Sequence, residues 1–150
     1  MGQDTLGLKE IYFENNLAYK RTDDERFSGV AQKKRKNRHA VYEEHYEDGI
    51  ILKSIVYYNG DERKIAGIVL FNKYKPFVKK KEFFYRKSTD WSGIIMYNDN
   101  GKRIYEEQFE NGILTYGCEY VGKKKHGQEI CLNDDGTKTI TEYVNGKRKK

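Results

Sequence analysis

The feature that most constrains this chain is a recurring dipeptide, Asn-Gly or Asp-Gly. It stands at 48–49, 59–60, 100–101, 111–112, 135–136 and 145–146. Both central residues of a type I′ turn need a positive φ, so these dipeptides are the strongest short signals for a β-hairpin. Within pairs the interval is 10 or 11 residues, which leaves room for one strand and its turn. Because no window shows a helical period of apolar residues over three turns, we predict an all-β fold.

The chain also repeats itself. "FSGV" at 27–30 matches "WSGI" at 91–94, and "VYEE" at 41–44 matches "IYEE" at 104–107. Repeated units of this size bury their apolar side chains only against their neighbours. We therefore expect an elongated antiparallel meander of β-hairpins that forms a twisted sheet, with 1–150 as a single β-repeat domain. Its expected parts are lead-in strands at 10–26 and repeat units at about 27–60, 61–90, 91–125 and 126–148.

Alternation along the strands predicts which side chains share a face. In "IYEEQFENG", Tyr105, Glu107 and Phe109 are expected on one face and Glu106 on the other. In "TITEYVNG", Tyr143 is expected to repeat the role of Phe109, so that rings form a ladder along the sheet. Aromatic residues make up 14% of the chain and charged residues 35%, which fits a thin aromatic core with many exposed charges.

The net charge of +6 is concentrated in two segments. Residues 31–38 carry five positive charges and none negative, residues 71–88 carry seven positive and one negative, and the remainder sums to −5. Such residues can keep hairpin tips and sheet edges soluble, or they can attract an acidic partner. In the second segment they alternate with rings, which suits a protein partner. The same mixture suits single-stranded nucleic acid, an anionic membrane, or a divergent hairpin with core rings and solvated lysines.

The candidate partner-binding residues come from these two segments. They are Lys33, Lys34, Arg35, Lys36, Lys73, Lys75, Phe77, Lys79, Lys80, Lys81, Phe83, Phe84, Tyr85 and Arg86.

Two cysteines flank "EYVGKKKHGQEI". If this stretch folds as a hairpin centred between Lys124 and Lys125, Cys118 and Cys131 lie directly opposite and can form a disulfide in an oxidising compartment. Free thiols fit the sequence equally well. With His126 between them, the spacing does not make a zinc site, so no metal is expected.

Catalytic patterns are missing from the sequence. The three histidines have no nucleophile in a strained turn nearby, and no phosphate-binding glycine loop is present. The acidic pairs Glu43-Glu44 and Glu106-Glu107 point to opposite faces of their strands, so neither makes an acid–base dyad. We expect a protein that is not an enzyme and that uses no cofactor and no small-molecule substrate.

The sequence leaves the compartment open. It has no apolar run of the roughly 18 to 20 residues that a transmembrane helix needs. The chain as given has no signal peptide, but Gln3-Asp4-Thr5 directly after Met1-Gly2 is typical of a mature exported protein with an added start. On that interpretation the protein is periplasmic or exported, and otherwise it is cytoplasmic.

The repeats resemble a known family. "FSGVAQ", "VYEEHYEDGIILKSIVYYNG" and "WSGIIMYNDNGKRIYEEQFENGILTYGCEYVGKKKHGQEICLNDDG" look like the YwqK-family antitoxin repeats, which are related to MORN repeats, and "IYFENNLAYKRTDDERFSG" resembles the lead-in of that family. The likeness covers residues 10–148. Residues 73–90 depart from the pattern, because they lack an Asn-Gly turn and hold the only proline, Pro76.

This resemblance implies a function. Members are described as antitoxins or immunity-type proteins, so we expect a protein that neutralises a cognate bacterial toxin or effector by direct binding, with an acidic patch on that partner. A MORN-like scaffold at an envelope or membrane is the alternative, and a basic module that binds nucleic acid is a further one. Anionic lipid and nucleic acid are less favoured partners than a protein.

Overall fold

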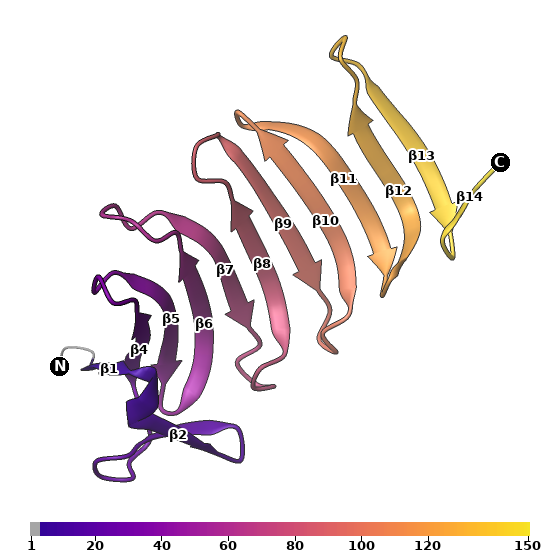
Figure 1. The fold of residues 1–150 in the computed structure, drawn as a ribbon. Helices are drawn as coiled ribbons and strands as arrows, with labels where there is room; N and C mark the ends of the chain where they lie inside the picture. The colour runs from indigo at the N-terminus through magenta and orange to yellow at the C-terminus, as the bar shows by residue number, and fades with distance from the viewer. Residues whose placement is uncertain (1–3) are drawn as a thin grey trace. The chain divides into compact units, whose positions relative to one another are not determined.

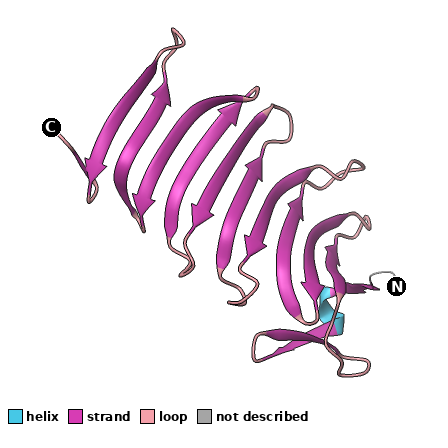
Figure 2. Cartoon of the chain, turned by 180° about the vertical axis from the view of Figure 1, so that it is seen from behind, coloured by secondary structure: helices cyan, strands magenta, loops and turns pink. Residues whose placement is uncertain are grey.

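The computed structural model describes residues 4–150, and the chain divides into two compact units, Met1–Lys79 and Lys80–Lys150. The interpretation of the chain start depends on residues 1–3, which lie outside the described residues. The predicted all-β fold is confirmed: twelve strands belong to a mostly antiparallel open sheet, five from the first unit and seven from the second (Figure 1). Within the described residues the only helix is a single 3-10 turn (Figure 2).

The first unit combines a five-stranded sheet with a small separate ribbon. The order of its sheet is β1-β4-β5-β6-β7, in which β1 is parallel to β4 and the other pairs are antiparallel. Strands β2 and β3 pair only with each other. The elements are β1 (Asp4–Gly7), η1 (Leu8–Glu10), β2 (Ile11–Glu14), β3 (Leu17–Lys20), β4 (Gly29–Lys34), β5 (Ala40–Glu47), β6 (Ile50–Tyr57) and β7 (Ile65–Phe71).

The second unit is a meander in chain order, β8 to β14, and every pair in it is antiparallel. Register shifts interrupt three of its pairs, between β9 and β10, between β10 and β11, and between β11 and β12. The strands are β8 (Lys79–Tyr85), β9 (Trp91–Tyr97), β10 (Arg103–Glu110), β11 (Ile113–Val121), β12 (Lys124–Leu132), β13 (Lys138–Val144) and β14 (Lys147–Arg148).

Three of the six glycine dipeptides form the predicted two-residue turns. At 48–49, 111–112 and 145–146 both residues have positive φ, for example 52° and 77° at Asn111 and Gly112. The dipeptides at 100–101 and 135–136 lie inside five-residue loops. That at 59–60 lies in the loop 58–64, which a hydrogen bond from the Tyr58 amide to the Lys64 carbonyl closes. All six dipeptides therefore lie in a turn or loop between two strands, as predicted, but the length of that loop varies.

The apolar core of the first unit lies between its sheet and the β2–β3 ribbon. A hydrogen bond from the Ala18 amide of the ribbon to the Gly49 carbonyl (2.9 Å) joins the two, and the Phe27 amide, in the segment that leads into β4, donates to the Ala18 carbonyl (2.9 Å). At Gly29, where φ is 145°, a Cβ would lie 2.2 Å from the Asp4 carbonyl oxygen, so only glycine lets β1 approach β4. The buried core is Ile11, Ala18, Phe27, Ala31, Tyr46 and Ile51.

Facing in the second unit confirms one prediction and corrects another. Glu107 and Phe109 share a face, and Glu106 points to the other, as the alternation predicts. Tyr143 does not repeat the role of Phe109, because the register across β10 to β13 places it on the face of Glu106. The turns after these two rings lie on opposite edges of a meander that advances in one direction. Equivalent positions therefore face opposite sides.

Candidate functional site

The core-bearing face of the first unit is only partly covered. The register places Lys33 opposite Tyr42 and Tyr42 opposite Val56. Residues two apart on a strand share a face, so this row lies on the same side as the buried Ala31 and Tyr46. The ribbon packs over the buried pair and leaves the row that contains Lys33 open.

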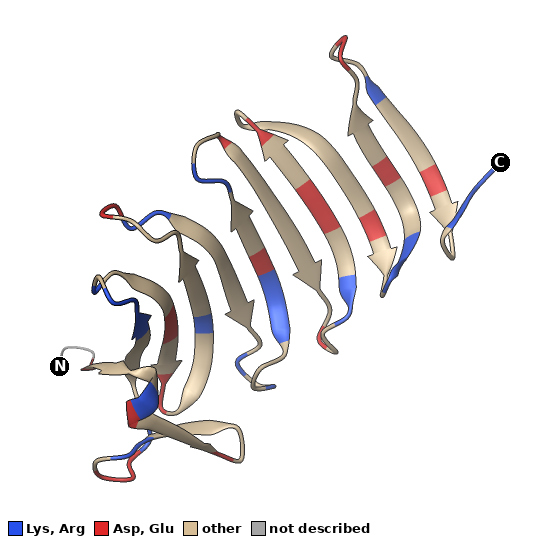
Figure 3. Cartoon of the chain, in the orientation of Figure 1, with Lys and Arg blue, Asp and Glu red and all other residues tan. Residues whose placement is uncertain are grey.

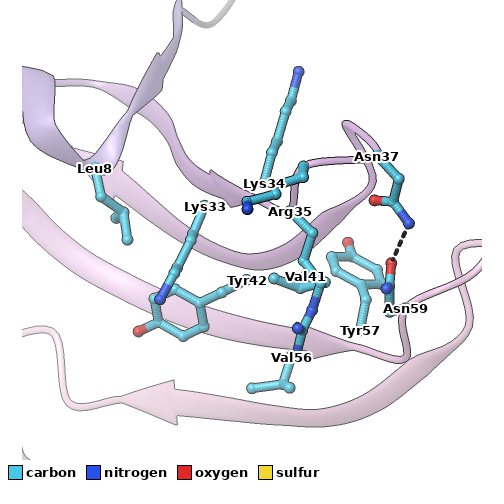
Figure 4. A pocket seen from close by; sticks show the side chains of 11 residues that line it. Leu8, Lys33, Lys34, Arg35, Asn37, Val41, Tyr42, Val56, Tyr57 and Asn59 are labelled. Atoms are coloured by element: carbon cyan, nitrogen blue, oxygen red, sulfur yellow. Dashed lines mark hydrogen bonds between the residues drawn. The ribbon is translucent and has the colours of Figure 1, made fainter.

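The open end forms a hollow of about 1050 Å³, which we name the basic hollow. It is bounded by η1, by strands β4 to β6, and by the loops 35–39 and 58–64. Figure 4 shows Lys33 and Arg35 beside the strands that carry Tyr42 and Val56. The floor consists of Leu8, Tyr42 and Val56, and the rim of Lys33, Lys34, Arg35, Lys36, Asn37 and Asn59, while Val41 and Tyr57 line the hollow from the ends of β5 and β6.

Hydrogen bonds between two loops hold the rim in place. The Arg35 amide donates to the His39 carbonyl (3.0 Å), and the His39 amide donates to Asn37 Oδ1 (3.1 Å). Asn37 Nδ2 then donates to Asn59 Oδ1 at 3.2 Å, the dashed line in Figure 4. A contact of 3.3 Å between His39 Nε2 and Asp61 Oδ1 joins the loops a second time. The basic side chains therefore extend from an ordered backbone, which lowers the entropy lost on binding.

The carboxylate of Glu44, which shares a face with Tyr42, already accepts two hydrogen bonds from tyrosine hydroxyls. Tyr42 and Tyr46 donate their hydroxyls to the two oxygens of Glu44, at 2.9 and 3.0 Å. Burial, with a further contribution from Glu44, raises the pKa of Tyr42 to about 12, and the same causes raise the pKa of Tyr46. Both hydroxyls therefore keep their protons at neutral pH and occupy Glu44 as donors.

The rim carries positive charge that the chain does not neutralise. In the part of the chain that the structure describes, none of Lys33, Lys34, Arg35 or Lys36 forms an ion pair with a carboxylate, and all four side chains are exposed. An aromatic and aliphatic floor with a cationic rim provides buried contact area at the centre and attraction at the edge. The arrangement suits an acidic partner that carries an apolar side chain.

The opposite face holds a carboxylate with no free capacity. Glu43, buried to 4% exposure, accepts from Gln32 (2.9 Å), His45 and Tyr57 (both 3.1 Å), and Arg63. Burial opposes its ionisation, but these hydrogen bonds and the Arg63 charge outweigh that effect and lower the pKa of Glu43. Four donors occupy the acceptor sites of the carboxylate. This network binds strands together and leaves no oxygen free for a substrate.

The segment around residues 71–88 is divided between the two units, and its first part belongs to the first unit. Lys73 and Lys75 are exposed in the loop 72–78. Phe77, at φ 66°, packs its ring edge-on against Phe13 (5.6 Å between centroids) and Phe71 (6.3 Å). The Phe77 ring thus extends the aromatic cluster of the first unit, although it keeps 41% exposure.

The remaining residues of that segment lie along β8. Lys79 and Lys80 are exposed, while Lys81 lies over the ring of Phe83 at 5.2 Å. Phe84 faces the opposite side from Phe83 and is 36% exposed. Tyr85 is half-buried. Beyond the strand, Arg86 stacks over the ring of Trp91 at 4.6 Å. Two of these cations are therefore already placed on rings of their own unit.

The predicted alignment of the cysteines is wrong. The turn is at Gly122-Lys123, two residues before the expected centre, because Gly122 supplies the positive φ of 62°. A register shift between Cys118 and Tyr120 then moves the pairing by two residues back toward Cys131. Cys118 lies opposite Glu129 and Cys131 opposite Tyr116, so the cysteines are diagonal neighbours on one face. Diagonal Cα atoms are roughly 7–8 Å apart, beyond the usual reach of a disulfide. Both thiols are free.

Sequence reasoning found the rim of the basic hollow but missed its floor. Lys33 to Lys36 stand out as a charge run, whereas Leu8, Tyr42 and Val56 come from three separate elements. The only signal for the floor was the period of two in β5 and β6, which places Tyr42 and Val56 on a shared face once the register is known. The contribution of η1 had no signal at all.

No model of a known protein family matches the chain, and no curated protein matches it either. No helix in the described part of the chain is long and apolar enough to span a membrane. Among residues 4–150 no group of three or more His, Cys, Asp or Glu side chains is placed to hold a metal ion.

Proposed function

We propose that this chain is a binding protein of the antitoxin or immunity type, which neutralises a toxin or effector by covering part of its surface. The observation that carries the proposal is the basic hollow: four cations that pair with no carboxylate of residues 4–150, around a floor of tyrosine and aliphatic side chains. A stable complex buries about 800 Å² on each partner, and the surrounding sheet and loops extend the contact to that size.

The finer family assignment is part of the same proposal. The hairpin meander and the repeated Gly-aromatic-Asn-Gly pattern support kinship with the YwqK-type antitoxin repeats, whose described role is neutralisation by binding. The occupied carboxylate at Glu43 supports a non-enzymatic role, because its four donors leave no acceptor site for proton transfer to a substrate.

The partner is expected to present an acidic patch with an apolar residue at its centre. Rim charges steer the encounter and desolvated floor contacts hold the complex, so charge reversal at the rim should act on both affinity and association rate. Lys33 and Arg35 are the two rim residues to change first, because they lie over the strands that carry the floor.

The test is neutralisation by defined variants. A toxic protein encoded beside this chain's gene is expressed with the wild-type chain, with K33E/R35E, or with the charge-matched control K87E/K138E, which changes exposed lysines of the second unit. We expect the wild type and the control to restore growth and to form a complex with the purified toxin. The rim variant should lose binding by at least about tenfold, as two reversed contacts predict.

Two results would contradict the proposal. One is full-strength neutralisation by K33E/R35E that folds like the wild type by circular dichroism. The other is preferential binding of the wild type to anionic vesicles or to oligonucleotides, with steep salt dependence and no protein complex, which would instead assign a membrane scaffold or a nucleic-acid-binding module.

A further inference from the structure

A second cationic surface lies on one edge of the second unit, where hairpins collect residues that are far apart in sequence. Its parts are residues 98–104, 120–125 and 143–149, which we name the tip row. The Gly122 amide donates to the Arg103 carbonyl (3.2 Å), and the Gly146 amide donates to the Lys125 carbonyl (2.8 Å). The first bond joins segment 98–104 to segment 120–125, and the second joins segment 120–125 to segment 143–149, so the tip row is continuous.

The tip row concentrates positive charge. Its three segments hold two, three and three Lys or Arg residues against one acidic residue, Asp99. Figure 3 shows this charge at the ends of β10 and β12 and beyond β13. Within the described chain, Lys102, Lys123 and Lys124 are exposed and form no ion pair. No single stretch of sequence carries the cluster, which exists only because alternate turns lie on one edge.

Exposed aliphatic side chains stand between these cations. Ile104, Val121 and Val144 are 41%, 62% and 47% exposed. Between the start of β10 and the β11–β12 turn there is a hollow of about 510 Å³, lined by Ile104, Val121, Lys102 and Lys124 among others. Each turn region thus presents an aliphatic group beside lysines, the mixture expected for a contact that is both desolvated and steered by charge.

We propose that the tip row binds an acidic, extended protein segment that carries aliphatic side chains. Five strands, β10 to β14, span about 19 Å at the usual separation, a length that about six extended residues cover. Nucleic acid fits less well, because the rings that a base would need are already covered. Arg103 lies over Tyr120 at 3.9 Å, and Lys125 lies over Tyr143 at 5.1 Å. The proposal stands without the function proposed for the basic hollow.

The test uses the full chain and two labelled synthetic peptides, one with leucines interspersed among glutamates and one with each leucine replaced by serine. Fluorescence anisotropy should show about tenfold tighter binding of the leucine peptide, because a leucine side chain buried against the aliphatic groups adds affinity that serine does not. K102E/K123E/K124E should remove binding of both peptides. The control K80E/K87E/K138E reverses three exposed lysines elsewhere on the same unit and should leave binding unchanged.

A second pair of variants assigns the contact. I104S/V121S should lose the preference for leucine and keep the affinity for the serine peptide. K33E/R35E should leave both affinities unchanged, and a loss there with retention in K102E/K123E/K124E would assign the peptide to the basic hollow and overturn the proposal. Equal affinity for the two peptides, or tighter binding of an oligonucleotide or an anionic vesicle, would overturn it as well.

Discussion

The two units carry the same repeat but treat the apolar face of the sheet differently. In the first unit the β2–β3 ribbon packs on that face, and Phe27 and Ile51 are almost completely buried beneath it. In the second unit the buried side chains within the described residues are Cys118 and the carboxylates of Glu82 and Glu129. Burial of aliphatic and aromatic area therefore stabilises the first unit to a degree that the second does not match.

The opposite face is built in the same way in both units. A strand glutamate accepts hydrogen bonds, and a cation that pairs with it lies over a tyrosine ring. Arg63 lies over Tyr57 at 4.7 Å beside Glu43, and Lys125 lies over Tyr143 at 5.1 Å beside Glu129. In both units, therefore, the polar face of the repeat satisfies its own charged groups through hydrogen bonds and ion pairs. The apolar face differs, because in the first unit the β2–β3 ribbon packs over it, and among the described residues the second unit has no such ribbon.

The largest effect is expected from removing a core ring of the first unit. Phe27→Ala should lower the free energy of unfolding by about 3–5 kcal/mol, because a fully buried ring leaves a cavity under the ribbon. Its repeat counterpart, Trp91→Ala, should cost less, since that ring is half-buried. Urea denaturation followed by circular dichroism measures both. Equal losses would remove the distinction between the units.

The second prediction compares equivalent glutamates on the polar face. Glu43→Gln should destabilise by about 2 kcal/mol, because the new amide opposes donors that the carboxylate had satisfied. Glu106→Gln should cost well under that, since its contacts to Arg103 and Gln108 are 3.4 and 3.5 Å long. A larger loss at Glu106 in urea denaturation would show that the polar face matters more where the apolar face is open.

Acid should weaken both networks. The pKa of Glu43 is lowered by its hydrogen bonds and Arg63 against the effect of burial, and the pKa of Glu129 is lowered chiefly by Lys125. A carboxyl with a lowered folded-state pKa contributes stability above its unfolded value, near 4.5, and loses it as pH falls through the folded value. The urea concentration at the unfolding midpoint should therefore decrease as the pH is lowered below about 4.5. In Glu43→Gln this decrease with pH should be smaller than in the wild type. An unchanged slope in the variant would contradict this assignment.

The features that could be predicted from sequence are those that one turn or one strand determines by itself. Asn111-Gly112 specifies its own turn, and the facing of Glu107 follows from a period of two within one strand. The errors at Tyr143 and the cysteines arose between strands, where bulges and the choice of edge set the register. The floor of the basic hollow and the tip row could not be predicted for the same reason, because each consists of residues that only the strand pairing brings together.

Turn glycines give a smaller and well-matched comparison. Gly49 and Gly112 occupy the same position of the same turn, at φ 80° and 77°. A Cβ at Gly49 would lie 3.0 Å from the Ala18 carbonyl oxygen, whereas one at Gly112 would meet nothing within 4 Å. Gly112→Ala should therefore cost only the backbone strain, about 1 kcal/mol, and Gly49→Ala should cost more because the ribbon must shift. Urea denaturation of the two variants measures both losses of stability. Equal losses would mean that the β2–β3 ribbon can shift away from residue 49 without a measurable cost.

The smallest effect is one of reactivity and leaves stability unchanged. Cys118 is 1% exposed, and burial raises the pKa of its thiol, while Cys131 is half-buried two positions away on the same face. Because the thiolate is the reactive form, Cys131 should react with a thiol reagent at least about tenfold faster than Cys118. Reaction at Cys118 requires local opening of the second unit, so its rate measures how weakly that uncovered sheet is held. Mass spectrometry of partly labelled protein identifies the faster site. A single rate for both thiols, or a mass that shows them bonded, would mean that the β11–β12 register differs from the one described.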